Sequence, residues 1–158
     1  MVTEGLCIAA LDVTTADATI RALARLLAAA GHVLPSFEAA ALARERRSPT
    51  GLPFPGVAVA LPHADPEHVR APAIAIATLA RAVRFRQMGA PELTLDVRIV
   101  VVPALTAAEQ AAGALARVIE QLQDAALRDA LLAAPDAAAI AARFASVASV
   151  ASSPELAR

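Results

Sequence analysis

Residues 44–63 read RERRSPTGLPFPGVAVALPH, a succession of charged, turn-forming and apolar residues that fixes the neighbouring elements. The arginines at its start predict the end of a helix, because cations are stabilised near the negative end of the helix dipole. Three prolines and two glycines then predict a loop over residues 48–56. Residues 57–61 are apolar and predict a buried strand, which Pro62 ends. His63 is therefore presented just past the carboxyl end of a strand.

Upstream of this stretch, the pattern predicts one strand and two helices. Residues 6–11 form an apolar run typical of a short buried strand. The sequence Thr14–Asp17 predicts a capping box, with the Thr14 hydroxyl as the cap and a carboxylate three residues on. Gly31 ends the helix that follows. Ser36 is expected to cap a second helix that runs to about Arg47.

Downstream, apolar runs predict further strands at residues 73–80 and 95–102, with a short extended piece at residues 83–85. We expect a turn around Arg81 and a loop over residues 87–91. Because such connections are too short for a crossover helix, the strands on either side must be antiparallel, and the sheet must be mixed.

The C-terminal part is predicted to be helical. Thr106 and Glu109 form a second capping box, opening one helix with an apolar face made of Leu115, Val118, Ile119 and Leu122. Asp124 and Asp136 are expected to cap two further short helices. We therefore predict an α/β fold, a single domain over residues 1–148 with a mixed β-sheet flanked by helices on its faces. A frayed tail over residues 149–158 is expected to follow.

Composition excludes several classes of protein. The net charge is −1, with no lysine and no basic run, which argues against nucleic-acid binding and attraction to acidic membranes. No uncharged apolar run approaches the ~18 residues of a membrane span, so membrane insertion is not expected. The start of the chain lacks the pattern of a signal peptide, and we expect a cytoplasmic protein. The single cysteine, Cys7, lies in an apolar run and is expected to be a small buried side chain.

His63 is the candidate for chemistry. Pro62 fixes a backbone torsion, so the imidazole is held by a stiff segment at a position where α/β sheets place reactive groups. Neutral imidazole is nucleophilic near pH 7 and can form covalent intermediates. The local pattern also fits a histidine hydrogen-bonded in a turn. A zinc site formed by His63, Asp65 and His68 is a further alternative, although the two histidines lack the i, i+4 spacing of helical zinc ligands.

The segment from Arg44 to Leu52, followed by Gly56 to His63, resembles the active-site signature of enzyme IIA components of the bacterial sugar phosphotransferase system. The type is the fructose–mannitol one, whose pattern is an Arg-Glu pair, Pro-Thr-Gly, Gly-Val-Ala and hydrophobic-Pro-His. The likeness covers about residues 4 to 145. Several later segments resemble the galactitol-specific branch of the family most. These segments are residues 63–69, 72–75, 83–85, 88–89, 109–110 and 122–124.

The resemblance implies a phosphotransferase with a phosphohistidine intermediate at His63. In this family the histidine accepts phosphate from the phosphocarrier protein HPr and passes it to a cysteine of a IIB component. Arg44 matches the family's arginine, whose guanidinium would hold phosphate oxygens. Ser48 and Thr50 offer hydroxyls beside it. Neither a metal nor an organic cofactor is implied.

One departure concerns a second active-site histidine, which the mannitol and nitrogen-related branches carry where this chain has residues 107–110. No histidine follows His68. Gln110 is expected to donate a hydrogen bond in its place, and His68 is a candidate to assist.

Two other functions stay open at this point. A regulatory binding protein of the nitrogen-related type would use phosphorylation of His63 as a switch of about −1.5 to −2 charges. A zinc-dependent hydrolase would need bound metal. The sequence does not identify the sugar, although the branch that it resembles is specific for galactitol. The oligomeric state is also open, since an alanine-rich surface could serve either HPr docking or self-association into a homo-oligomer.

Overall fold

The computed structural model describes residues 2–151. In chain order its elements are η1 (Glu4–Leu6), β1 (Cys7–Leu11), α1 (Ala16–Ala29), α2 (Phe37–Arg47), β2 (Gly51–Leu52), β3 (Ala58–Ala60), η2 (Pro66–His68), β4 (Ala73–Gln87), β5 (Ala90–Ala104), α3 (Ala107–Ala111), α4 (Ala114–Leu122), α5 (Ala125–Ala133) and α6 (Ala137–Ala151). Within the described residues, no helix is long and apolar enough to cross a membrane.

The sheet is built around the long hairpin of β4 and β5. These strands pair antiparallel from Ala73 opposite Ala104 to Gln87 opposite Ala90. Strand β1 joins β4 in parallel, and β3 joins β5 in parallel. The two-residue strand β2 pairs antiparallel with β3, and its Gly51 also pairs with Gln87 of β4. The predicted mixed sheet is confirmed.

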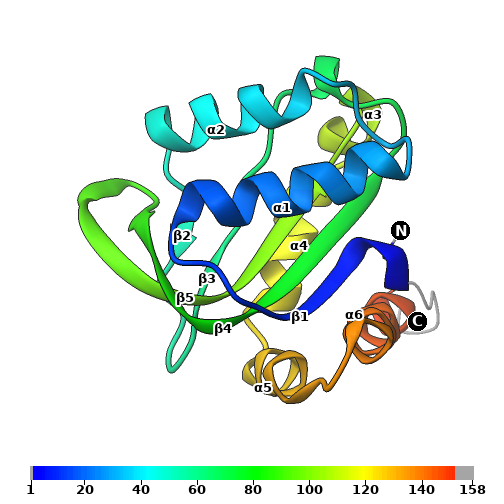
Figure 1. The fold of residues 1–158 in the computed structure, drawn as a ribbon. Helices are drawn as coiled ribbons and strands as arrows, with labels where there is room; N and C mark the ends of the chain where they lie inside the picture. Colours follow the sequence, from blue (N-terminus) through cyan, green and yellow to red (C-terminus); the bar gives the residue numbers. More distant parts are fainter. Residues whose placement is uncertain (1, 152–158) are drawn as a thin grey trace, which may run out of the picture.

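Helices cover both faces of this sheet, with α1 and α2 on one side and α4, α5 and α6 on the other (Figure 1). Alternate residues of the strands enter two separate apolar cores. Leu79 and Phe85 pack in the core beneath α1 and α2, whereas Ile76, Ile99 and Val101 pack in the core beneath α4 to α6. The arrangement is the α/β domain with helices on both faces of a mixed sheet that the sequence predicts.

Strand β4 corrects the prediction of a turn around Arg81. The predicted strand 73–80 and extended piece 83–85 are one continuous strand. Thr78 pairs with Ile99 and Val83 with Val97, so β4 contains extra residues that bulge out between them. Arg81 lies in this bulge and forms an ion pair with Asp12 at 3.0 Å. A bulge interrupts the apolar pattern as a turn does, which is why the sequence suggested a break. The actual reversal is tight and consists of residues 88–89, rather than the predicted loop 87–91.

Neither predicted N-cap side chain of the first two helices caps its helix as expected. The cap of α1 is Thr15 rather than Thr14, since the Thr15 hydroxyl accepts from the amide of Ala18 at 3.1 Å. The carboxylate of Asp17 binds Arg46 instead of completing a capping box. Ser36 precedes α2 as predicted, but its hydroxyl lies 2.8 Å from Nδ1 of His68 and caps no amide. Gly31 ends α1 with a φ of +80°, as predicted.

The single helix expected after Thr106 is two helices. Thr106 does cap the first, accepting from the amide of Glu109, but α3 ends at Ala111. Gly113 then takes a left-handed conformation with φ +79°, and α4 starts anew. The predicted apolar face is nevertheless correct, because Val118 and Leu122 are buried in the core beneath α4. Glycine costs little in this left-handed conformation, so the chain bends there.

The caps predicted for the last helices are confirmed. Asp124 accepts from the amide of Ala126, and Asp136 accepts from the amide of Ala139. The helix after Asp136 is not short, since α6 continues through Ala151, three residues into the tail predicted from residue 149. The rest of that tail, residues 152–158, lies outside the described residues.

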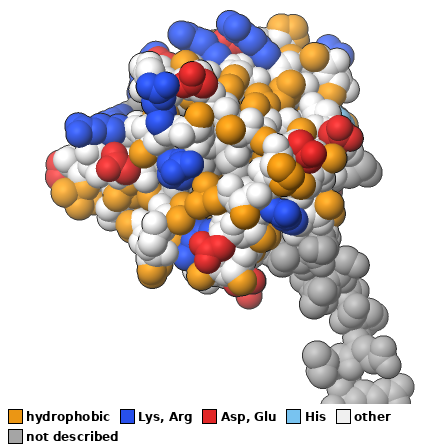
Figure 2. Space-filling view, turned by 60° about the horizontal axis from the view of Figure 1, so that its bottom comes forward, with side chains coloured by type: hydrophobic (Ala, Val, Ile, Leu, Met, Phe, Trp, Pro, Cys, Tyr) orange, Lys and Arg blue, Asp and Glu red, His pale blue; other side chains and the backbone are white. Residues whose placement is uncertain are grey.

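The surface mixes apolar and charged side chains. On the face in Figure 2, apolar groups are interspersed with groups of both charges. Among the described residues, the large apolar side chains that are well exposed are Met88 and Leu93, near the tip of the β4–β5 hairpin. This surface identifies no partner and leaves the oligomeric state a prediction.

Gly51 is required where β2 meets β4. A Cβ atom at this position would lie 2.6 Å from the carbonyl oxygen of Arg86, which belongs to the backbone and cannot rotate away. We expect Gly51→Ala to lower the free energy of unfolding by about 1–3 kcal/mol, as overpacking does. Thermal unfolding measures the effect. Gly5→Ala is the control, because nothing lies within 4 Å of its Cβ position, and equal stability of the two variants would contradict the prediction.

Candidate functional site

His63 lies three residues beyond the end of β3, and its side chain is 7% exposed. Its Nδ1 is 2.8 Å from the carbonyl oxygen of Leu61. A carbonyl oxygen can only accept a hydrogen bond, so Nδ1 must carry the proton. In the neutral ring, Nε2 then holds the free lone pair. The geometry therefore selects Nε2 as the nucleophilic atom.

Burial keeps this ring neutral. Desolvation lowers the pKa of His63 below its ordinary value, and the positive charge of Arg44 acts in the same direction. The hydrogen bond to Leu61 and the charge of Asp65 raise the pKa but do not offset the burial. At pH 7 the imidazole is consequently unprotonated at Nε2 and can attack an electrophile.

Thr50 and Glu45 hold the backbone on which His63 depends. The amide of Leu61 donates to Oγ1 of Thr50 at 3.1 Å. Thr50 in turn donates its hydroxyl to Oε2 of Glu45 at 2.8 Å and its amide to Oε1 at 3.1 Å. These bonds form a continuous path from Glu45 through Thr50 and Leu61 to His63, which we call the Glu45–His63 hydrogen-bond chain.

Arg44 provides a positive charge at the site. It lies in the last turn of α2, and its charge lowers the pKa values of both His63 and Glu45. Its Nε is buried and has no hydrogen-bond partner among the described residues. A buried donor without a partner is costly, so an acceptor bound to this Nε would remove that cost. Arg44 therefore brings a positive charge and an unused donor to this part of the molecule, and both suit an anion.

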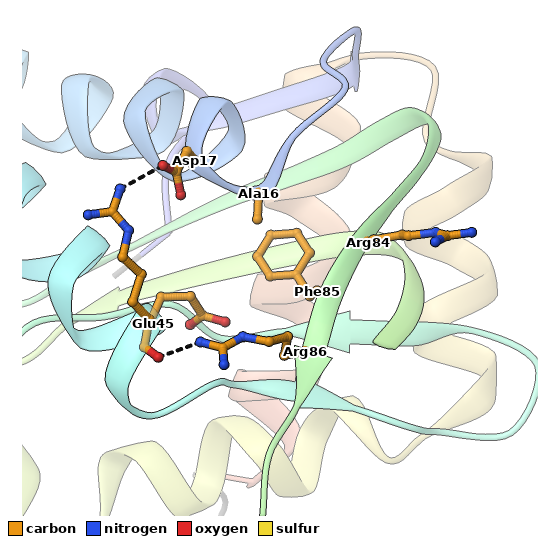
Figure 3. Close-up of a pocket in the computed structure, with 7 residues that line it drawn as sticks. Ala16, Asp17, Glu45, Arg84, Phe85 and Arg86 are labelled. Carbon is orange, nitrogen blue, oxygen red and sulfur yellow. Dashed lines mark hydrogen bonds and ion pairs between the residues drawn. The ribbon is translucent and has the colours of Figure 1, made fainter. Parts of the chain in front are cut away.

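A small cavity of about 200 Å³ lies behind Glu45, bordered by the start of α1, the end of α2 and β4 (Figure 3). Asp17 forms an ion pair with Arg46 at 2.8 Å on its rim. Arg86 donates to the backbone carbonyl of Arg46, and its guanidinium lies beside the Glu45 carboxylate. Charged side chains thus line much of this cavity, and it lies next to Glu45, the end of the Glu45–His63 hydrogen-bond chain that is farthest from His63.

The other predicted site residues are Ser48, Gln110 and His68, and none of them is part of the Glu45–His63 hydrogen-bond chain. Ser48 is exposed and ends α2, where its amide bonds to the carbonyl of Arg44. Gln110 is exposed on α3, a helix that contacts η2. His68 belongs to η2, but Nδ1 lies 2.8 Å from Ser36 and Nε2 lies 3.3 Å from Glu67. No hydrogen bond or ion pair joins any of these three side chains to His63 among the described residues.

The zinc alternative lacks a ligand set in the described chain. No group of three His, Cys, Asp or Glu side chains there is placed to hold a metal. Cys7 is buried, and burial raises the pKa of its thiol to about 11. This thiol is therefore inert, as its apolar surroundings in the sequence predict.

Glu45 is the residue that the sequence prediction missed. The family resemblance includes it only as part of the Arg-Glu pair and gives it no role. It stands beside three arginines in the sequence, yet it is 9% exposed. The signal available in the sequence was its separation of five residues from Thr50, which spans a helix end and allows a side chain to reach back to a loop hydroxyl.

Comparison with protein families gives a match over residues 1–147 to the phosphoenolpyruvate-dependent sugar phosphotransferase system, EIIA 2. The chain belongs to this family. As a type 2 EIIA domain it is a phosphotransfer component of the sugar phosphotransferase system (PTS). No curated protein sequence matches the chain.

Solved structures share the fold at low sequence identity. The PTS IIA protein PtxA from Streptococcus mutans superposes with a TM-score of 0.76 at 18% identity, covering 98% of this chain and 94% of that one. Enzyme IIAMtl of Escherichia coli, in complex with phosphorylated IIBMtl, gives 0.75 at 18% identity and covers 92% and 99%. The nitrogen regulatory protein IIA-Ntr from Neisseria meningitidis gives 0.70 at 18% identity and covers 90% and 95%.

An NMR titration tests the electrostatics of the EIIA site. We expect His63 to titrate below 6.5, and Arg44→Met to raise its pKa because a neighbouring positive charge is removed. Between the lowered pKa and 6.5 the unfolded chain binds more protons, so the His63 contribution to the free energy of unfolding falls as the pH is lowered through this window. Arg47→Met, an exposed arginine of the same helix end, serves as control. A His63 pKa at or above 6.5 in the unmodified protein would refute this prediction.

Proposed function

We propose that this EIIA domain carries phosphate on Nε2 of His63, accepting it from phosphorylated HPr and passing it to a cysteine of a IIB component during sugar uptake. The observation that supports this most directly is the Nδ1 hydrogen bond to Leu61, which leaves Nε2 free on a neutral, buried ring. Membership of the EIIA 2 family agrees with it. IIAMtl, which shares the fold, has been solved in complex with a phosphorylated IIB protein.

The transfer step balances without a cofactor. The Nε2 lone pair attacks phosphorus, and the bond from phosphorus to the donor breaks with its electron pair staying on the donor. The ring gains positive character, which the Leu61 carbonyl stabilises through the Nδ1–H that it accepts. Arg44 offsets the incoming negative charge of the phosphoryl oxygens. Attack by a thiolate of IIB then reverses the N–P bond formation.

The choice of sugar belongs to the membrane component of such systems, so galactitol stays a prediction from the sequence resemblance. A regulatory protein controlled by phosphorylation is the second candidate, favoured by the common fold with IIA-Ntr. The two differ in what happens to the phosphate. A carrier passes it rapidly to IIB, whereas a regulator keeps it and changes its affinity for another protein.

Incubation with phosphorylated HPr tests the proposal. We expect acid-labile phosphate on His63, abolished in His63→Ala, and quantitative transfer onward when a IIB protein encoded beside this chain's gene is added. His68→Ala is the matched control and is expected to be labelled. Labelling of His63→Ala at the normal rate would sink the proposal. Labelling of His63 without onward transfer would favour the regulatory function.

Arg44 is tested with phosphoramidate, a small donor that requires no protein docking. We expect Arg44→Ala to be phosphorylated about 10²-fold more slowly, the usual loss when one donor to a developing anion is removed. Arg44→Lys should recover part of the rate, because it restores charge but not the planar fork. Arg47→Ala is the control. Equal rates for Arg44→Ala and the unmodified protein would show that the guanidinium does not assist transfer.

A further inference from the structure

The Glu45–His63 hydrogen-bond chain has a direction that follows from the chemistry of its members. The Leu61 amide can only donate, so Thr50 Oγ1 accepts from it and keeps its own hydrogen to donate to Glu45. The Thr50 amide also donates to Glu45. Both carboxylate oxygens therefore act as acceptors, and the ionised form of Glu45 fits this pattern.

The surroundings of Glu45 offset part of the cost of a charge in a buried position. Burial raises the pKa of Glu45 above its ordinary value, and the two Thr50 hydrogen bonds and the charges of Arg86 and Arg44 reduce that rise without cancelling it. Figure 3 shows the Arg86 guanidinium next to the Glu45 carboxylate. Burial of an isolated carboxylate has a large free-energy cost. The burial of Glu45 with two hydrogen bonds from Thr50 and two nearby cations therefore indicates a role that a neutral side chain would not perform.

The far end of the chain is the carbonyl of Leu61, which determines the tautomer of His63. Leu61 is 1% exposed. The hydrogen bond from its amide to Thr50 fixes it on one side, and Pro62 fixes it on the other. If this hydrogen bond to Thr50 is lost, the Leu61 carbonyl is free to tilt, and the Nδ1–H of His63 loses its best acceptor. The ring then has less reason to keep its proton on Nδ1.

We propose that Glu45 and Thr50 are positioning residues that hold His63 in its Nδ1–H tautomer and thereby reserve Nε2 for the phosphoryl group. The tautomer part follows from the hydrogen bonds alone, and the phosphoryl part rests on the proposed function. Neither side chain touches the reacting atoms. Both act through the backbone of Leu61, two residues before the histidine.

The first experiment observes the tautomer without any phosphate. The protein is labelled with ¹⁵N-histidine, and the ring nitrogens of His63 are assigned with His63→Ala, which is practical because the chain has three histidines. In the unmodified protein we expect a protonated Nδ1 and an unprotonated Nε2. In Thr50→Val and Glu45→Gln we expect both ¹⁵N shifts to move toward each other as the Nε2–H tautomer becomes populated.

Matched variants separate positioning from a loss of folding. Thr50→Ser keeps the hydroxyl and should restore the normal shifts. Glu38→Gln removes a carboxylate of the same helix that forms ion pairs with Arg21 and Arg25 at the surface, and it should leave the shifts unchanged. If Thr50→Val does not fold, Glu45→Gln has nearly the same shape and provides the comparison. Normal His63 shifts in folded Thr50→Val or in folded Glu45→Gln would overturn the proposal.

The second experiment uses phosphoramidate and identifies the phosphorylated nitrogen by ³¹P and ¹⁵N NMR. Thr50→Val and Glu45→Gln are expected to react about fivefold to tenfold more slowly at Nε2, with product appearing at Nδ1, and Thr50→Ser is expected to behave normally. An unchanged rate with phosphate at Nε2 alone would count against the positioning role. Failure of the unmodified protein to accept phosphate from either donor would instead overturn the proposed function, while the tautomer measurement would still judge Glu45 and Thr50.

Discussion

The antiparallel pairing of β4 with β5 is the constraint on which the other parts of the molecule depend. Each strand has 15 residues, and the hairpin supplies apolar side chains to both cores. It also carries β1 on one edge and β3 on the other. Because β3 has only three residues, its pairing with β5 fixes its position, and through it the position of His63 just beyond its end. A shift in the hairpin would therefore move His63.

The elements that sequence predicted well have strong local signals. Gly31 ends α1 by its own backbone preference, and Asp124 caps α5 with a side chain that is close in sequence to the amide it binds. The errors occur where two local solutions compete. Thr14 and Thr15 both offer a hydroxyl, and the pairing of Asp17 with the distant Arg46 accompanies the later cap. Tertiary contacts of this kind are not visible in a local pattern.

The same distinction applies to the site. His63 was found because it stands alone after a strand and a proline, and Arg44 and Thr50 because the family motif contains them. The hydrogen bonds of these residues could not be predicted, since a motif gives the spacing of residues in the sequence but not the directions in which their side chains point. Glu45 reads as one charge among several on a helix end, and only its burial distinguishes it. Ser48, Gln110 and His68 make no hydrogen bond or ion pair with His63 among the described residues, and their roles stay predictions.

Under the proposed function, Arg44, which is partly buried, would serve both states of the carrier. Before transfer, its positive charge opposes protonation of His63 and so preserves the lone pair on Nε2. After the proposed transfer, the same charge would attract the phosphoryl oxygens, and Nε, which has no partner among the described residues, would gain an acceptor. Glu45, with its charge already engaged by Thr50, limits the excess positive charge without competing for the phosphate. A stronger cationic site would bind phosphate too tightly to release it, so positive charge balanced by a buried carboxylate suits a group that must be passed on.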